Sequence, residues 1–340
     1  MLNERIDVDV IAKNRNTPQY LLKLTALMKR LPAHHPILEE VKEQVAIHKA
    51  GFNGERALDF PLSFVKSKGH TVYHDIRINH NSSYFQMDSL VVTPYYLLLI
   101  EVKNISGTLL FDPIFNQLIR TSRNNDVEEA FPDPLTQVRR QHLQLLTFLH
   151  QHRFPSIPIE TLVVVSNRST VLKATNDVKE IATQVIKSDY LPTKIKAFDN
   201  KYLEEKLSMK EMRRLGRLLI KHHTPLDIDV LRRFSLSRLD LLEGVHCPEC
   251  RCLPMKRLHG RWICMKCGGV SRDAHLKALG DYALLVSNWV TNQEVRSFLK
   301  VESADAVKRL LGELNLEYVG ANKARKYKLD NRVINRFADK

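Results

Sequence analysis

The sequence predicts an α/β (α+β) protein in which helices flank a mixed sheet, followed by two smaller modules. Strand-like and helix-like segments are interspersed over residues 20–221, which favours a mixed sheet. All five cysteines fall between Cys247 and Cys267, which indicates a separate module there. Between Val245 and Lys340 there are 18 Lys and Arg against 10 Asp and Glu, so +8 of the net charge of +14 lies at this end.

Composition limits the classes of protein to which the chain can belong. With 340 residues and 44% apolar residues, it is long enough to bury a large core and to divide into domains. We expect an N-terminal helical extension at 1–45, the main domain at 46–225, the cysteine module at 243–272 and a basic module at 280–340. The high net charge favours polyanionic partners, with a merely solvated basic surface as the alternative.

Cysteine use and hydropathy indicate a cellular setting. Clustered cysteines are typical of a metal site in a reducing compartment rather than of a disulfide framework. The first ten residues are mostly polar and acidic, unlike a secretion leader. No apolar run approaches the ~18 residues that a membrane span requires. We therefore expect a cytoplasmic protein without a membrane partner.

The elements of the main domain follow from apolar periodicity and from turn residues. Helices are expected at 21–31 and 37–48, divided by Pro32 and Pro36, and a turn at Gly51 and Gly54 precedes another helical segment. A closing helix at 203–221 and a polar linker at 222–229 end the domain. Strands are expected at 71–78, 84–92, 95–103, 107–111, 117–121, 161–165 and 181–187, with a helix at 134–150.

Two of these strands place acidic residues side by side. If 84–92 and 95–103 form a hairpin that turns at Pro94 and Tyr95, Asp88 lies opposite Glu101 and Gln86 lies opposite Lys103. Side chains that oppose each other directly are about 5 Å apart at Cβ, and Lys103 shares a face with Glu101 because it lies two residues along the strand. Val102 then points into the core. A slip of one residue would turn Asp88 to the other face.

Two neighbouring carboxylates repel each other unless a cation shares their site. Lys103 supplies one such charge, and Mg²⁺ or Mn²⁺ would supply a stronger one, because hard oxygen ligands suit these ions. A bound ion would activate water and stabilise charge on a phosphate, and Lys103 would orient or deprotonate that water or neutralise the charge. The alternative for Glu-X-Lys is a surface ion pair. The apolar run at 97–100 argues against it, because it marks an interior strand.

Four motifs in a fixed order resemble the nuclease-related domain (NERD) pattern, a branch of the PD-(D/E)XK nuclease superfamily. They are GFNGE at 51–55, QMD at 86–88, EVK at 101–103 and DPLTQ at 133–137. The resemblance covers about residues 45–165 and implies a restriction-endonuclease-like fold. Met87 departs from the pattern, since it stands where the superfamily has Pro.

The resemblance also implies roles for individual residues. It makes Asp88 and Glu101 ligands of the catalytic Mg²⁺ or Mn²⁺ and Lys103 the catalytic lysine, with Glu55 near the metal and Gln137 bracing the site or the substrate. Each of the last two has an alternative: Glu55 would merely favour a helix N-terminus, and Gln137 would be a surface residue of a helix that Asp133 caps.

The cysteine module has the spacing of a zinc ribbon. Cys247 and Cys250 form one Cys-X-X-Cys pair, and Cys264 and Cys267 form a second pair. Thirteen residues separate the two pairs. Two such pairs offer four thiolates to one tetrahedral Zn²⁺, which leaves no open position and makes the site structural. A redox role is the competing interpretation. Cys252, His246 and His259 are alternative ligands, and the pattern resembles ribbons appended to topoisomerases, although ribbons also bind proteins.

The last segment has the proportions of a helix-turn-helix, winged-helix-like module. Helices at 288–299 and 303–314, with N-caps at Thr291 and Ser303, are followed by a hairpin at 316–329. The second helix would enter the major groove of DNA, and basic side chains would contact phosphates. These basic side chains are Arg296, Lys308, Arg309, Lys323, Arg325, Lys326 and Lys328. The alternative is a helical protein-interaction domain.

The leading hypothesis from the sequence is a Mg²⁺-dependent nuclease that acts on DNA, with the zinc ribbon and the basic module aiding binding. The first alternative is a non-cleaving, regulatory DNA-binding protein that keeps the nuclease fold as a scaffold. The second is a zinc-stabilised adaptor that binds neither nucleic acid nor a catalytic metal. The nuclease hypothesis predicts DNA cleavage that Asp88→Ala abolishes. The DNA-binding scaffold predicts salt-dependent DNA binding without cleavage, and the adaptor predicts neither.

Overall fold

The chain folds into two units in the computed structural model, which describes residues 11–65, 69–80, 82–123, 126–176 and 178–335. The first unit comprises Met1–Asn16 and Lys49–Pro225, and the second comprises Thr17–His48 and Leu226–Lys340. Each has its own buried core. Among the described helices, none combines the length and the apolar character needed to cross a membrane.

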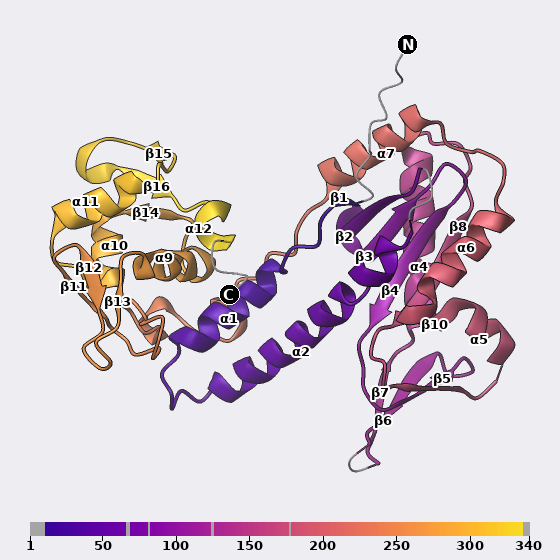
Figure 1. Ribbon diagram of the computed structural model, residues 1–340, viewed down its shortest axis with the longest axis horizontal. Coiled ribbons are helices and arrows are strands. Elements are labelled where there is room, and N and C mark those ends of the chain that lie inside the picture. Colours follow the sequence, from indigo (N-terminus) through magenta and orange to yellow (C-terminus); the bar gives the residue numbers. More distant parts are fainter. Residues whose placement is uncertain (1–10, 66–68, 81, 124–125, 177, 336–340) are drawn as a thin grey trace. The chain divides into compact units, whose positions relative to one another are not determined.

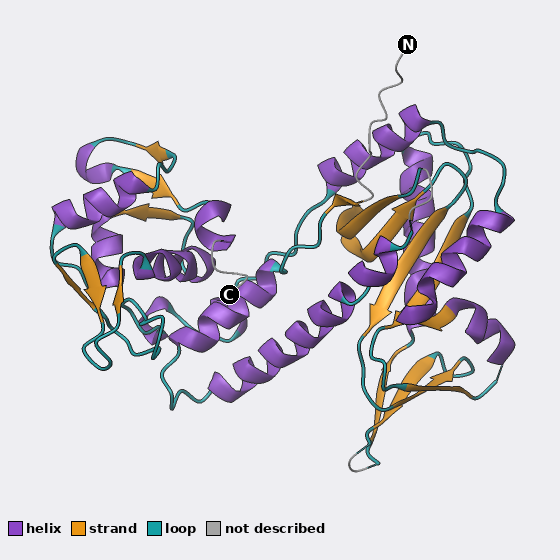
Figure 2. Ribbon diagram, viewed as in Figure 1, coloured by secondary structure: helices purple, strands orange, loops and turns teal. Residues whose placement is uncertain are grey.

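A six-stranded mixed sheet forms the centre of the first unit (Figures 1 and 2). The strands β2, β3 and β4 are antiparallel, whereas β8 runs parallel to both β4 and β10, and β1 runs parallel to β2. In sheet order, they are β1 (Ile11–Lys13), β2 (Thr71–His80), β3 (Ser83–Val92), β4 (Leu97–Lys103), β8 (Ile159–Val165) and β10 (Val185–Lys187). Strand β4 is almost wholly buried, and so are residues Leu162 to Val165 of β8, as the apolar runs predict.

A second, four-stranded sheet carries part of the same core. In sheet order it contains β7 (Glu128–Pro132), β6 (Gln117–Thr121), β5 (Thr108–Asp112) and β9 (Val171–Ala174). Its side chains Leu109, Phe111 and Leu118 join the core of the main sheet. The sequence predicts β5 and β6 to within a residue, but it does not indicate β7 or β9.

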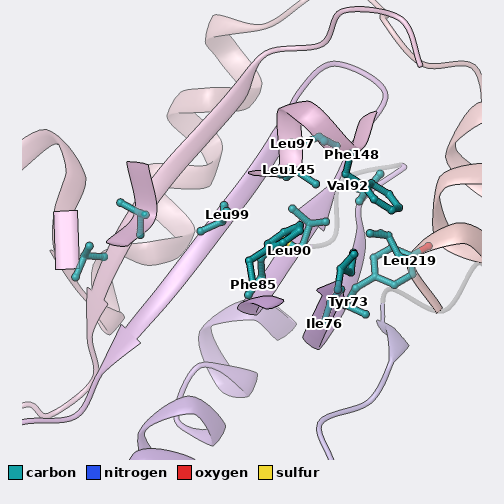
Figure 3. Packing of buried hydrophobic residues seen from close by; sticks show 14 of the residues in the cluster. Tyr73, Ile76, Phe85, Leu90, Val92, Leu97, Leu99, Leu145, Phe148 and Leu219 are labelled. Carbon is teal, nitrogen blue, oxygen red and sulfur yellow. The ribbon is translucent and has the colours of Figure 1, made fainter. Parts of the chain in front are cut away.

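Helices cover both faces of the main sheet. On one face α4 (Pro134–Gln151) and α7 (Met209–His222) pack on the core that Figure 3 shows, which includes Leu90, Leu99 and Leu145. On the other face, α3 (Asp59–Ser63) and α6 (Leu191–Lys201) cover a second core. The mixed sheet flanked by helices is the predicted fold class.

The helix boundaries differ from expectation in two places. Residues 181–187 are not a single strand, because α5 (Val178–Gln184) precedes β10. Residues 203–208 are not helical; α7 begins after Ser208, which closes a capping box with Glu211. The capping signal was present in the sequence, and the serine is a stronger N-terminus than the apolar Leu203.

The glycine-containing segment 51–55 also forms a different structure from the predicted turn. It lies inside one long helix, α2 (Leu38–Arg56), and the boundary between the two units falls within that helix. A Cβ atom at Gly54 would lie 2.3 Å from Cβ of Asn104 and 2.8 Å from Oγ of Ser166. Gly54 therefore lets the helix pack closely against the loops that follow β4 and β8, which sets the position of Glu55.

The second unit joins segments from both ends of the chain in one core. Side chains of the cysteine module, such as Trp262, pack with Leu279 of α9 (Ala274–Leu285) and Phe298 of α10 (Asn292–Leu299). Arg30 at the end of α1 (Gln19–Arg30) donates from Nε to Oδ2 of Asp281 at 2.8 Å and from Nη1 to the carbonyl oxygen of Gly244 at 2.8 Å. Both Arg30 and Asp281 are buried, so α1 is an integral part of this unit.

The remaining elements of the second unit are short. The cysteine module has the strands β11 (Lys256–Leu258), β12 (Arg261–Ile263) and β13 (Val270–Ser271). The C-terminal part has the sheet order β14-β16-β15. The short helix α8 (Val230–Arg233) precedes the cysteine module. The elements of the C-terminal part are α9 (Ala274–Leu285), β14 (Trp289–Thr291), α10 (Asn292–Leu299), α11 (Ala304–Glu313), β15 (Tyr318–Val319), β16 (Lys326–Lys328) and α12 (Asn331–Asn335).

Candidate functional site

The hairpin of β3 and β4 has the predicted register. The chain turns at Pro94 and Tyr95, where Oγ1 of Thr93 accepts hydrogen bonds from the N–H groups of Tyr95 and Tyr96. Ser89 pairs with Ile100 and Val92 with Leu97, so Asp88 lies level with Glu101 at the end of the regular ladder. Val102 is buried in the opposite core, as predicted.

Asp88 holds its carboxylate by a contact that the sequence does not indicate. Its Oδ2 accepts a hydrogen bond from the backbone N–H of Val102 at 2.8 Å, where regular pairing between the two strands stops. Burial raises the pKa of Asp88 well above its usual range, and the charges of Glu101 and Glu55 raise it further. The three carboxylates therefore share one electrostatic environment.

Glu101 is held from both sides by residues of β4 and α4. Lys103 donates from Nζ to its Oε1 at 2.8 Å and to Oε1 of Gln137 at 3.0 Å. Gln141 donates from Nε2 to Oε2 of Glu101 at 3.0 Å and to the carbonyl oxygen of Gln86 at 2.7 Å. The side chain of Glu101 is 6% exposed and that of Lys103 is 22% exposed, so the pair lies at the edge of the core rather than on the surface.

Helix α4 is positioned for this contact by its own first turn. The side chain of Asp133 accepts hydrogen bonds from the N–H groups of Leu135 and Thr136, and Pro134 is the first helical residue. The helix packs on β3, β4 and β8. Gln137 and Gln141 are four residues apart and so lie on one face of the helix, where both reach the carboxylate site.

Glu55 enters the site from α2 and is bound to an arginine. Nη1 of Arg15 donates to its Oε2 at 2.6 Å. Burial raises the pKa of Glu55 to about 7 even though the charge of Arg15 opposes this shift. Glu55 lies near the C-terminal end of α2, so the alternative role at a helix N-terminus does not apply.

Gln86 does not oppose Lys103 as predicted. Its side chain donates from Nε2 to Oδ1 of Asp75 at 2.9 Å. The register of β2 and β3 puts Asp75 opposite Asp88, but these two residues do not form a ladder pair. The backbone of Asp75 has a φ of 49°. The β3–β4 ladder ends at the pair Ser89 and Ile100, so Gln86 and Lys103 are not partners in it.

The sequence did not indicate several members of the site. Gln141 lies four residues after Gln137, and this helical spacing indicates that both side chains lie on the same face of the helix. Arg15 and the buried pair His74 and Ser89 carry no motif, because their partners lie more than ten residues away in the chain.

The carboxylate site has the donor chemistry for Mg²⁺ or Mn²⁺. Mg²⁺ commonly binds one or two protein carboxylates and keeps several water ligands, which matches Asp88 and Glu101. Oε1 of Gln141 is buried and, within the described residues, accepts no hydrogen bond, so a metal-bound water would give it a donor. No three carboxylates of the described residues come close enough to enclose an ion on their own.

The four cysteines of the ribbon form the second site. The ligand atoms of Cys247, Cys250, Cys264 and Cys267 all lie within 4.8 Å of one another, close enough to hold one metal ion. Within the described part of the chain, neither a histidine nor Cys252 joins this group. Cys252 instead accepts a hydrogen bond at its carbonyl oxygen from the N–H of Cys247.

The two Cys-X-X-Cys turns owe their shape to the residues that follow them. Arg251 and Gly268 have φ values of 59° and 74°, and their N–H groups donate to the carbonyl oxygens of Cys247 and Cys264. Glycine adopts this conformation without strain, whereas Arg251 adopts it at a cost. The thiolate set is suited to Zn²⁺.

The basic residues of the C-terminal part lie on α10, α11 and the β15–β16 hairpin. Helices α10 and α11 begin after the predicted N-caps Thr291 and Ser303, and Lys300 between them adopts a φ of 57°. The expected helix at 288–299 is therefore wrong at its start, because residues 289–291 form strand β14, which pairs with β16. Lys308, Arg309 and Lys326 are exposed. Among the others, Arg296 donates to the carbonyl oxygen of Glu302, Arg325 stacks on Tyr318, Lys328 pairs with Glu317, and the side chain of Lys323 lies outside the described part.

Comparison with known proteins identifies the region that contains the carboxylate site. Residues 50–166 match the family model described as "Nuclease-related domain", NERD. Neither the curated proteins nor the solved structures contain a match. The matched segment contains Glu55, Asp88, Glu101, Lys103 and Gln137, and it ends directly after β8. The first unit therefore contains a nuclease-related domain (NERD) at residues 50–166, which is consistent with the PD-(D/E)XK superfamily, and the second unit contains a cysteine cluster consistent with a zinc ribbon.

Proposed function

We propose that this protein is a Mg²⁺- or Mn²⁺-dependent nuclease that hydrolyses phosphodiester bonds in DNA. The observation that carries the proposal is the contact of Lys103 with Glu101 beside Asp88, at the edge of a buried sheet and inside the segment that matches a nuclease-related domain. Burying two charges in an interior strand costs more free energy than burying an apolar pair. An ion pair at such a position therefore indicates a role other than stability.

Each residue of the site has a defined part in this reaction. Asp88 and Glu101 would hold the divalent ion, which would supply an activated water and stabilise charge on the phosphate. Lys103, which Gln137 orients, donates to the phosphate oxygen or orients the attacking water. Gln141 keeps Glu101 in place, and its Oε1 would accept a hydrogen bond from a water in the site. Glu55 adds a third carboxylate to the site, and Arg15 balances its charge.

The second unit would bind and place the nucleic acid. Its Cys₄ site would hold a structural Zn²⁺, because four thiolates leave no position for substrate. Helices α10 and α11 with the following hairpin have the proportions of a winged helix-turn-helix, and Lys308 and Arg309 are exposed on the second helix. Such side chains would contact the DNA backbone, which makes binding depend strongly on salt.

One observation favours the alternative of a DNA-binding scaffold without cleavage. Both carboxylate oxygens of Glu101 already accept hydrogen bonds, from Lys103 and Gln141, so the arrangement is stable without a metal. In that case the protein would bind DNA through its second unit, and replacing Asp88 or Glu101 would leave binding intact. The adaptor hypothesis predicts no DNA binding at all.

A cleavage assay separates these functions. Linear, circular, single-stranded and double-stranded DNA, and RNA, are incubated with protein and Mg²⁺ or Mn²⁺, and binding is measured separately by fluorescence anisotropy. We expect cleavage by the wild type and at least a ~10³-fold loss in Asp88→Ala and Lys103→Ala, with DNA affinity changed less than about threefold. A wild type that binds DNA but cuts no substrate supports the scaffold and rejects the nuclease.

A further inference from the structure

Arg15 is the most enclosed cation of the carboxylate site, although it lies 35 residues before the matched nuclease-related segment. It follows β1, and its side chain is 2% exposed. Buried arginines need partners for their donors, because an unpaired buried charge is costly. Arg15 meets this requirement at every nitrogen of its guanidinium group.

The contacts of Arg15 reach both the carboxylates and the strand that carries Asp88. Nη1 donates to Oε2 of Glu55 at 2.6 Å and to the carbonyl oxygen of Asp88 at 3.3 Å. Nη2 donates to Oγ of Ser89 at 3.0 Å and lies 2.9 Å from Nδ1 of His74. Nε approaches Oδ1 of Asp59 at 3.5 Å. Arg15 is thus fixed in position by five partners on the four elements α2, α3, β2 and β3.

The charge of this group is permanent. It comes from a guanidinium group, which carries its positive charge on the side chain itself and needs no bound ion. It stands between Glu55 and the backbone of Asp88, where a second divalent ion would need Glu55 as a ligand. In sites with two ions the ions lie ~3.5–4 Å apart and share carboxylates. Arg15 is already bound to Glu55, the carboxylate that a pair of ions would have to share.

We propose that Arg15 is the resident second cation of the carboxylate site, so that the site takes one divalent ion at Asp88 and Glu101 instead of two. This inference rests on the proposed function, because it concerns the ion of the same site. Arg15 is a positioning residue: it acts by neutralising Glu55 and by holding the backbone of Asp88. The site therefore extends beyond the matched domain to the segment that precedes it.

The number and affinity of bound ions test this proposal without reference to cleavage. Zinc-loaded protein is titrated with Mn²⁺, and free Mn²⁺ is measured by electron paramagnetic resonance. We expect one ion per wild-type chain that Asp88→Asn abolishes. Arg15→Met removes a positive charge next to the ion, so it should bind Mn²⁺ at least about ten-fold more tightly. Arg15→Lys keeps the charge and should stay within about threefold of the wild type.

Lys13 provides the matched control. It lies in β1, two residues before Arg15, and donates to the carbonyl oxygens of His74 and Asp75 at 2.8 and 2.9 Å. Lys13→Met therefore loosens the same segment without touching Glu55, and we expect Mn²⁺ affinity within about threefold of the wild type. Circular dichroism of each variant reports whether it folds.

The outcomes separate this inference from the proposed function. One ion in the wild type with unchanged or weaker binding in Arg15→Met overturns the role of Arg15 alone. Two ions at the site of the wild type overturn it as well. A wild type that binds no Mn²⁺ sensitive to Asp88→Asn overturns the nuclease proposal together with it, and the absence of cleavage would accompany that result.

Discussion

The carboxylate site of the first unit and the cysteine site of the second unit hold negative charge in opposite ways. The four cysteines gather all their ligand atoms within 4.8 Å, whereas the carboxylates of Glu55, Asp88 and Glu101 are spread over three elements and each is held by a different donor. A closed set of four ligands suits an ion that only holds structure, and an incomplete set suits an ion that must also bind water and substrate. The difference favours the carboxylate site as the place of the proposed reaction.

The largest expected effect comes from removing the metal of the cysteine site. Both tryptophans, Trp262 and Trp289, lie in the second unit, and Trp262 packs in the core that contains Cys247 and Cys264. Binding of structural Zn²⁺ contributes ~10 kcal/mol or more to folding in small zinc modules. A strong chelator should therefore shift tryptophan emission to longer wavelength and abolish the cooperative unfolding of this unit. An unchanged emission spectrum in chelator would show that the cysteines hold no structural metal.

The glycines of α2 test how the carboxylate site is positioned. Gly54→Ala places a Cβ 2.3 Å from Asn104, so α2 must move, and we expect a loss of about 1–3 kcal/mol together with reduced cleavage. Gly51→Ala is the matched control in the same helix, because a Cβ there meets nothing within 4 Å. It should stabilise the helix by up to about 1 kcal/mol. Urea unfolding measures both, and equal effects at the two positions would contradict the close packing of α2.

A buried histidine makes the stability of the first unit depend on pH. Burial, together with the charges of Arg15 and Lys13, lowers the pKa of His74 to about 3. The folded state therefore favours the neutral ring, and this stability is complete above the unfolded pKa of ~6.5 and is lost as the pH falls below it. We expect a loss of about 2 kcal/mol between pH 7 and pH 5 from this group.

The variant His74→Asn should make that pH dependence shallower, because it removes the titrating ring while keeping a polar side chain for Arg15 and Ser89. Urea unfolding followed by far-ultraviolet circular dichroism at pH 5, 6 and 7 measures the slope. A slope identical to that of the wild type would show that His74 is not held neutral.

The smallest expected effect concerns the fifth cysteine. Cys252 lies outside the group of four in the described structure, so Cys252→Ser should leave zinc affinity within about twofold of the wild type. Cys250→Ser removes a ligand and should weaken zinc binding by more than about 100-fold, since even partners of ligands contribute 10–100-fold. Competition with a chromogenic chelator measures both. Equal losses in the two variants would give Cys252 a place among the ligands.

The features that the sequence predicts are those that depend on local pattern. Alternation and apolar runs are enough to place β3, β4 and β8, and the Pro94–Tyr95 turn sets the register that brings Asp88 level with Glu101. The spacing of the cysteines likewise predicts their cluster, because both pairs are short motifs.

The features that the sequence does not predict depend on contacts between distant segments. The sequence predicts a turn at Gly51 and Gly54, since glycine normally weakens a helix, but the packing of Gly54 against Asn104 and Ser166 outweighs that preference. Arg15 reaches Glu55 across 40 residues and Ser89 across 74, and no local pattern carries such information. Asp88 departs from the regular ladder because a backbone N–H of β4 binds its carboxylate.

The most direct test of the account compares two glutamates on neighbouring strands. Glu101 pairs with Lys103 at 2.8 Å in the carboxylate site, and Glu160 on β8 pairs with Lys201 at the same distance at a more exposed position. The rate of DNA cleavage in Mg²⁺ is measured for Glu101→Gln and Glu160→Gln under identical conditions. The account predicts at least a ~10³-fold loss for Glu101→Gln and less than about a threefold change for Glu160→Gln. Cleavage by Glu101→Gln at the wild-type rate would contradict it.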